Sequence, residues 1–166
     1  MKKRPRKIVV AVSGGFDPLH IGHVRMFEHA RALGDKLVVI LNNDNWLRKK
    51  KHHIFMRQEE RREILGALRP VDRVALTKHG PNPGDMSVSR ELRALRPDIF
   101  ANGGDRNKRD AANPASSLYK DINTCKELGI RMVFKIGHGG KIQSSSWLLE
   151  RYVKKAKKKN TSRRRH

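Results

Sequence analysis

The chain contains a single cysteine, Cys125, and no hydrophobic run long enough to cross a membrane. One thiol excludes an intramolecular disulfide and a cysteine-based zinc site, and it fits a reducing, intracellular setting. The first apolar run, at residues 8–12, is followed by Gly14 and Gly15. A secretory signal needs about 7–15 apolar residues and a transmembrane helix about 18–20. We therefore expect a cytoplasmic protein with no transmembrane segment.

Acidic residues are absent from both ends of the chain. Residues 2–7 carry five Lys or Arg and residues 151–166 carry nine, and together they hold much of the net charge of +22. Such ends are usually solvated or disordered, with non-specific binding of nucleic acid or an anionic membrane as the alternative. Because 166 residues are too few for two ordinary domains, we expect a basic arm at 1–7, one domain at 8–153 and a disordered basic tail at 154–166.

Short β-branched runs alternate with amphipathic stretches over most of the chain. Strands are expected at residues 8–12, 37–41, 71–76, 98–101 and 130–136, and helices at residues 22–33, 57–68, from Ser87 or Ser89 to 95, 116–128 and 144–153. This alternation predicts a Rossmann-like α/β three-layer sandwich with a five-stranded, mainly parallel sheet. Ligands bind such sheets beyond the carboxyl ends of the strands, so we expect the chemistry in the turns that follow residues 12, 41, 101 and 136.

The first of these turns and the helix after it read SGGFDPLHIGH, at residues 13–23. Gly14 and Gly15 allow a sharp turn and close approach to a phosphate, and the next helix directs unpaired N–H groups at an anion. His20 and His23 share one face if the helix begins near His20, and Gly22 leaves that face open. An isolated HxxH pair is more often a metal pair or solvent-facing, but the strand and glycine turn before this one favour a phosphate site.

The run GGFDPLHIGH resembles the signature of the cytidylyltransferase-like branch of the HxGH nucleotidyltransferases, and it differs from the GxGxxG and Walker A patterns. The resemblance implies transfer of CMP or AMP from CTP or ATP to a sugar-phosphate or polyol-phosphate, with release of pyrophosphate. Within this branch the chain resembles glycerol-3-phosphate cytidylyltransferases and heptose-phosphate adenylyltransferase domains. His20 and His23 are then implied to bind the triphosphate, with Mg²⁺ carried by the nucleotide and no metal held by protein side chains alone.

The resemblance continues over roughly residues 8–150, in the family's order. A basic loop at residues 48–53, expected to be flexible, contains a lysine that is implied to reach a phosphate, although a solvated loop is the alternative. Arg61 is implied to lie near the acceptor, and its alternative is a helical ion pair with a nearby glutamate. Residues 102–105 resemble a GGD turn, with a plain turn as the alternative; Asp105 is implied to meet the nucleotide.

Residues 144–146 resemble a serine/threonine anion clamp at the start of the last helix, and Ser144 or Ser145 is alternatively a simple N-cap. The family often carries an arginine shortly before this cluster. Here His138 or Lys141 is expected to supply the positive charge.

The predicted site residues form three groups. The catalytic group is His20, His23, Lys51 and Arg61. The nucleotide-binding group is Gly14, Gly15, Phe16, Asp17, Gly22, Gly104, Asp105, Ser144, Ser145 and Ser146. The acceptor-binding group is Asp44, Lys49, Lys50, Arg57 and His138.

Two other functions compete on the sequence. One is a nucleic-acid-binding protein with an idle or regulatory nucleotide site, supported by the basic charge of residues 151–166. The other is a fragment of a class I aminoacyl-tRNA synthetase, but the chain lacks a KMSKS run and the length for an anticodon domain. Homodimerisation is also expected to be permitted, through exposed apolar residues such as Trp46 and Phe55.

Overall fold

Five strands form a single parallel sheet in the part of the chain that the computed structural model describes, residues 6–103, 113–114, 116–137 and 144–163. The strands are β1 (Val9–Gly14), β2 (Lys36–Leu41), β3 (Arg73–Leu76), β4 (Ile99–Gly103) and β5 (Arg131–Ile136). Their order is β3-β2-β1-β4-β5, with every neighbouring pair parallel. The predicted Rossmann-like class is confirmed. The strand order reverses between β1 and β4, where such sheets open a crevice for ligands.

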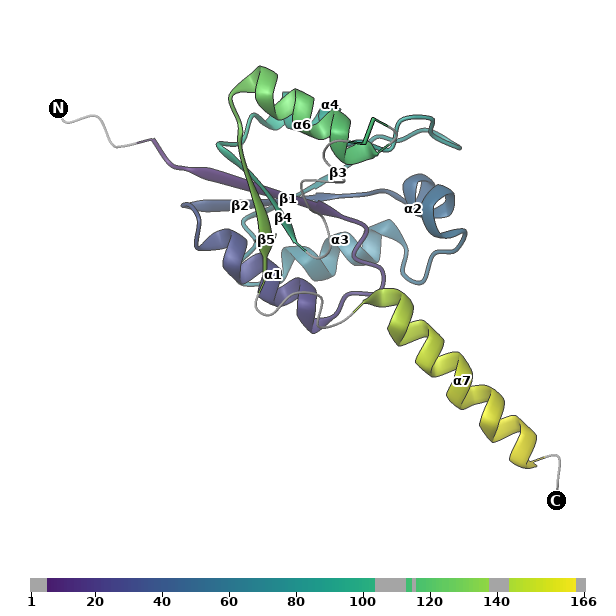
Figure 1. Ribbon diagram of the computed structural model, residues 1–166. Coiled ribbons are helices and arrows are strands. Elements are labelled where there is room, and N and C mark those ends of the chain that lie inside the picture. Colours follow the sequence, from purple (N-terminus) through teal and green to yellow (C-terminus); the bar gives the residue numbers. More distant parts are fainter. Residues whose placement is uncertain (1–5, 104–112, 115, 138–143, 164–166) are drawn as a thin grey trace.

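Helices cover both faces of the sheet (Figure 1). The bounds are α1 (Ile21–Arg31), α2 (Asp44–Lys51), α3 (Gln58–Gly66), α4 (Ser89–Leu95), α6 (Ser117–Leu128) and α7 (Ser145–Arg163). Helices α1 and α3 lie against one face and α4 and α6 against the other, while α7 extends away from the body (Figure 1). None of the helices in the described residues has the length and apolar character that a membrane span requires.

The strand residues alternate between two cores. Val10 and Val12 pack with Phe27 on the α1 side, and Ala11 and Phe100 pack on the α4 and α6 side. A strand that is buried on both faces needs apolar residues at every position, which explains the continuous apolar runs of β1 and β2.

The basic segment after β2 is a helix, so the prediction of a flexible loop at residues 48–53 is wrong up to Lys51. The Asn43 side chain caps α2 by accepting a hydrogen bond from the Trp46 amide over 3.1 Å, and the helix ends at His52 in the left-handed region, with φ 62°. Trp46 is 7% exposed, and its Nε1 donates to the Met86 carbonyl. Trp46 is therefore not the exposed apolar residue expected of a dimer surface, whereas Phe55 is exposed.

Two helix ends also differ from expectation. Neither Ser87 nor Ser89 caps α4; the N-cap is Val88. The Asp121 carboxylate on α6 accepts hydrogen bonds from the Val88 amide and the Ser89 hydroxyl, so a distant residue does the capping. Helix α7 does not end at residue 153 but runs on to Arg163, so the predicted domain boundary lies inside a helix.

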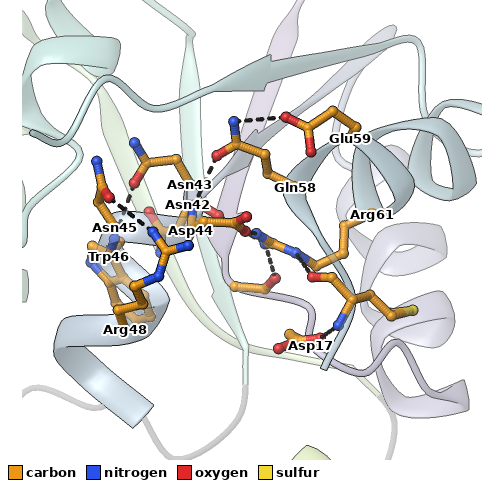
Figure 2. A network of polar contacts seen from close by, with 12 residues as sticks. Asp17, Asn42, Asn43, Asp44, Asn45, Trp46, Arg48, Gln58, Glu59 and Arg61 are labelled. Atoms are coloured by element: carbon orange, nitrogen blue, oxygen red, sulfur yellow. Dashed lines mark hydrogen bonds and ion pairs between the residues drawn. The ribbon is translucent and has the colours of Figure 1, made fainter. Parts of the chain in front are cut away.

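A buried guanidinium joins the segments that form the carboxyl edge of the sheet (Figure 2). Arg61, on α3, is 1% exposed. Its Nη1 donates to the carbonyl oxygens of Gly15, over 2.6 Å, and Asn42, over 2.8 Å. Its Nε donates to the Met56 carbonyl over 3.0 Å, and its Nη2 to Asp44 Oδ1 over 2.7 Å. Arg61 thus connects the ends of β1 and β2 to the start of α2 and the turn before α3.

Replacing Arg61 with Met should lower the free energy of unfolding by about 3 kcal/mol, because three carbonyl oxygens and one carboxylate would lose their donor in a buried setting. Urea unfolding measures this. The matched control is Arg62→Met, since its neighbour Arg62 is exposed and should change stability by less than about 0.5 kcal/mol. Equal midpoints for the two variants would contradict this role for Arg61.

Candidate active site

The two histidines of the HxGH motif stack on each other at the start of α1. Their ring centroids are 3.6 Å apart, with 20° between the planes. His20 is the N-cap, and its backbone amide donates to Nδ1 of His23 over 3.3 Å. Because His23 Nδ1 accepts this bond, the proton of the neutral ring is on Nε2. His23 can therefore present an Nε2–H donor to a phosphate oxygen.

Phe16 supports the histidine pair from the core. It is 5% exposed, and its ring makes edge contacts with His23 at 5.0 Å and with Phe27 at 5.1 Å between centroids. A Cβ on Gly14 would lie 2.7 Å from this ring. The Phe16 ring is thus packed in the core against His23 and Phe27, and its predicted role in nucleotide binding stays a prediction.

Burial keeps both histidines uncharged in the free protein. It lowers the pKa of His23 to about 3, with further lowering by the charges of His20 and Lys51. Burial and then Lys51 also lower the pKa of His20. At neutral pH both rings are therefore hydrogen-bond donors without a fixed charge, and a bound triphosphate would raise both pKa values.

Among the lysines of α2, Lys51 is the one that joins the histidine loop. Its Nζ donates to the Asp17 carbonyl over 2.8 Å. Burial lowers the pKa of Lys51, while Asp17 raises it and Arg61 lowers it further. Lys49 points elsewhere, with its Nζ 2.7 Å from Asn82 Oδ1, and Lys50 is exposed. Position thus distinguishes three lysines that are consecutive in the sequence.

Several predicted site residues prove to be engaged in holding the loops. Both carboxylate oxygens of Asp17 accept backbone hydrogen bonds, from Phe55 and Met56. Asp44 pairs with Arg61, whose side chain has no exposed surface. The ion pair of Arg61 is with Asp44 and not with a glutamate of its own helix, while its predicted position near the acceptor stays a prediction. Its guanidinium donates four hydrogen bonds to the protein.

The remaining predicted residues occupy varied positions. Arg57, the N-cap of α3, is exposed, and Gly22 lies in the first turn of α1. A Cβ on Gly15 would lie 2.7 Å from Leu47 Cδ2, so a larger residue there would require the Leu47 side chain to shift. Gly104, Asp105 and His138 lie outside the described residues.

The serine cluster at the start of α7 contacts the loop that carries the histidines. Ser145 is 8% exposed, and its hydroxyl donates to the Pro18 carbonyl over 2.9 Å. The hydroxyl of Ser144 accepts a hydrogen bond from the Trp147 amide, which is N-cap geometry, and Ser146 is exposed. The predicted juxtaposition of this cluster with the first motif is present, while its role as an anion clamp stays a prediction.

Two buried asparagines at strand ends were not among the predicted site residues. Asn42 follows β2 and Asn102 lies near the end of β4, and they are 4% and 5% exposed. Within the described part of the chain, Asn42 Oδ1, Asn102 Nδ2 and His20 Nδ1 are the buried side-chain atoms without a hydrogen-bond partner. A polar residue directly after a buried strand was the available signal.

The donor set near the histidines does not form a metal cage. Across the residues that the structure describes, no group of three or more His, Cys, Asp or Glu side chains is placed to hold a metal ion. The carboxylates of Asp17 and Asp44 are already engaged by backbone amides and by Arg61. A metal ion at this site would therefore depend on oxygen ligands from the nucleotide.

The depressed pKa of His23 makes the stability of the fold depend on pH. In the unfolded chain this histidine takes up a proton near pH 6.5, but in the folded chain only near pH 3, so stability falls as the pH drops between these values. At pH 5 the loss is about 2 kcal/mol relative to pH 7. Urea unfolding at both pH values should show a smaller loss for His23→Leu. An equal loss in the variant would sink this assignment.

Comparisons with known proteins identify the family of the chain. The cytidylyltransferase-like family model matches residues 11–133. An FAD synthase of Pyrococcus horikoshii is 40% identical over 102 residues, which are 61% of this chain and 66% of that protein. The bifunctional protein HldE of Koribacter versatilis is 36% identical over 106 residues, 62% of this chain and 20% of that protein. The match thus spans just under two thirds of the first relative and a fifth of the second.

A solved structure shows the same arrangement. The lipopolysaccharide core biosynthesis protein of Thermoplasma volcanium superposes with a TM-score of 0.62 at 28% identity, covering 80% of this chain and 99% of that one. The family model covers most of the sheet and includes the HxGH motif, Lys51 and Arg61. The protein therefore belongs to the cytidylyltransferase-like family of nucleotidyltransferases.

Proposed function

We propose that this protein transfers AMP from ATP to the phosphate group of a small phosphate monoester and releases pyrophosphate. The observation that carries the proposal is the convergence of His20, His23 and Lys51 on one loop at the carboxyl edge of the sheet, to which Ser145 is hydrogen-bonded. One cation, two imidazoles and a helix start form an anion site suited to a triphosphate. We place the reaction in the cytoplasm, where nucleoside triphosphates are available.

The reaction is an in-line displacement at the α-phosphorus. An oxygen of the acceptor phosphate forms a bond to that phosphorus while the bond to the oxygen bridging the α- and β-phosphates breaks, and the electron pair leaves with pyrophosphate. The acceptor phosphate is already ionised, so no general base is needed. The histidines and Lys51 stabilise charge on the equatorial and leaving oxygens, and fixed donors of this kind are commonly worth about 10²–10³ in rate each.

The residues fit a metal ion that arrives with the nucleotide. The carboxylates nearest the histidines are engaged, so we propose that triphosphate oxygens hold Mg²⁺. Bound in this way, Mg²⁺ would neutralise charge on the phosphates. The chain itself supplies the donors of His20 and His23 and the ammonium of Lys51, and its packed loops hold them in place.

The relatives favour ATP as the donor and leave two acceptor classes. FAD consists of AMP joined to FMN, so an FAD synthase such as that of Pyrococcus horikoshii uses adenylyl transfer. The HldE relative fits the adenylyl transfer to a sugar-phosphate that the sequence resemblance implies. We therefore propose FMN or a sugar-phosphate as the acceptor. CTP with a polyol-phosphate, the preference drawn from the sequence, becomes the competing pair.

A substrate panel tests the proposal. Pyrophosphate release is measured with ATP, CTP, GTP and UTP, each with FMN, a hexose 1-phosphate and glycerol 3-phosphate. We expect turnover with ATP and one of the first two acceptors. Turnover with CTP and glycerol 3-phosphate alone would replace AMP transfer by CMP transfer. Absence of turnover with every pair, together with salt-sensitive RNA binding, would favour the nucleic-acid-binding alternative instead.

Two substitutions test the anion site. His20→Ala and Lys51→Met should each lower kcat by about 10²-fold, because each removes a donor aimed at the phosphates. The comparison variants are His53→Ala and Lys50→Met, at exposed positions close in sequence; His53→Ala should stay within about twofold of the unmodified protein, and Lys50→Met should lose far less kcat than Lys51→Met. Circular dichroism checks that all four fold. If Lys50→Met lost as much activity as Lys51→Met, the assignment of Lys51 would be refuted.

A further inference from the structure

The buried asparagines at the ends of β2 and β4 carry polar atoms that the protein leaves unpaired. Asn42 Oδ1 lacks a hydrogen donor and Asn102 Nδ2 lacks an acceptor, among the residues that the structure describes. A buried amide without a partner costs about 1–3 kcal/mol of stability. By contrast Asn43, the next residue, has both ends engaged, since its side chain accepts from the Trp46 amide and donates to the His79 carbonyl. The lack of a partner is thus particular to Asn42 and is not shared by its neighbour Asn43 in the same turn.

Strand alternation assigns both asparagine side chains to the α4 and α6 side of the sheet. Ile40 and Phe100 belong to the core on that side, and Asn42 and Asn102 follow each of them by two residues, which is the period of a strand. The intervening residues Leu41 and Ala101 belong to the opposite core. A Cβ on Gly103 would meet Met26 of α1, on that opposite side, so the alternation holds past Asn102.

The asparagines flank the end of β1, which carries the glycine turn. Gly14 pairs with Leu41, the residue before Asn42, and Ala11 pairs with Phe100, two residues before Asn102. Since neighbouring strands are about 4.8 Å apart, β2 and β4 are separated by about 10 Å across β1. The two amides therefore border the crevice at the switch between β1 and β4, where ligands of such sheets bind.

The direction of the reaction assigns this position to the acceptor. The histidines lie at the start of α1, which packs on the face opposite to the asparagines. In an in-line displacement the attacking and leaving oxygens are on opposite sides of the phosphorus. With pyrophosphate held on the histidine side, the acceptor approaches from the asparagine side.

We infer that Asn42 and Asn102 bind the uncharged part of the acceptor and determine specificity for it, an inference that rests on the proposed adenylyl transfer. An amide oxygen and an amide N–H together select a molecule that offers both a hydrogen donor and a hydrogen acceptor. Sugar hydroxyls provide both, and so does the pyrimidine edge of a flavin. A phosphate monoester with an apolar chain provides neither, and should be a poor acceptor.

Asn42→Leu and Asn102→Leu test the inference, with Asn43→Leu as the matched control for a buried asparagine that the protein does engage. Each of the two test variants should raise KM for the best polar acceptor about three- to tenfold while KM for ATP and kcat with butyl phosphate remain unchanged. Urea midpoints of these variants should stay equal or rise, because an unpaired amide is removed. The midpoint of Asn43→Leu should fall.

The outcomes separate the inference from the proposed function. If the unmodified protein turns over and the acceptor KM is unchanged in both test variants, the inference is refuted while the proposed function stands. A raised KM for ATP would assign the amides to the nucleoside and also refute it, as would urea midpoints that fall as far as that of Asn43→Leu. Absence of turnover by the unmodified protein with any substrate pair removes the proposed function and this inference with it. FMN and hexose 1-phosphate are tested separately, so the affected acceptor identifies the class.

Discussion

The buried guanidinium of Arg61 is the interaction on which the arrangement of the site depends. One planar group donates to carbonyl oxygens at the ends of β1 and β2, to the turn before α3 and to a carboxylate on α2. A desolvated cation is tolerated when it is paired and hydrogen-bonded, so these segments approach one another in a geometry that serves these four bonds. The glycine turn, the Asp17 loop and the helix that carries Lys51 are consequently held relative to one another before any ligand binds.

Around the segments that Arg61 joins, other polar groups are buried without full compensation by charges or hydrogen-bond partners. The imidazoles are held neutral by burial, Lys51 is partly desolvated, and Asn42 Oδ1 and Asn102 Nδ2 lack partners within the described residues. Each of these features costs stability in the free protein and becomes favourable when a suitable charge or hydrogen-bonding group arrives. Such preorganisation is the usual trade between stability and function, and here it is concentrated at one edge of the sheet.

The fold could be predicted because its signals are local. An apolar run such as that of β2 is recognised as a strand because burial on both faces requires apolar residues throughout. A glycine-rich turn followed by His20 and His23 is recognised as a site from the strand expected before it and the helix expected after it. The misjudged features depend on distant partners. Trp46 is buried because its indole N–H reaches Met86, and α4 is capped by Asp121 from another helix. The basic, polar stretch after β2 gave no sign of the first contact, and the serines at residues 87 and 89 gave no sign of the second.

The sequence by itself determined the sheet, the position of its carboxyl edge and the histidine motif there, since these follow from hydrophobic period, turn residues and spacing. Only the tertiary structure decided what the other polar residues do. Lys49, Lys50 and Lys51 are alike in sequence, yet Lys51 reaches the Asp17 carbonyl because successive residues of a helix point about 100° apart. Arg61 is buried because its guanidinium donates to carbonyl oxygens that are distant in the sequence. Asn42 and Asn43 are adjacent in the sequence, yet the Asn43 side chain caps α2, whereas Asn42 Oδ1 has no partner within the described residues. Chain spacing cannot convey such differences, because they depend on where other segments place their donors and acceptors.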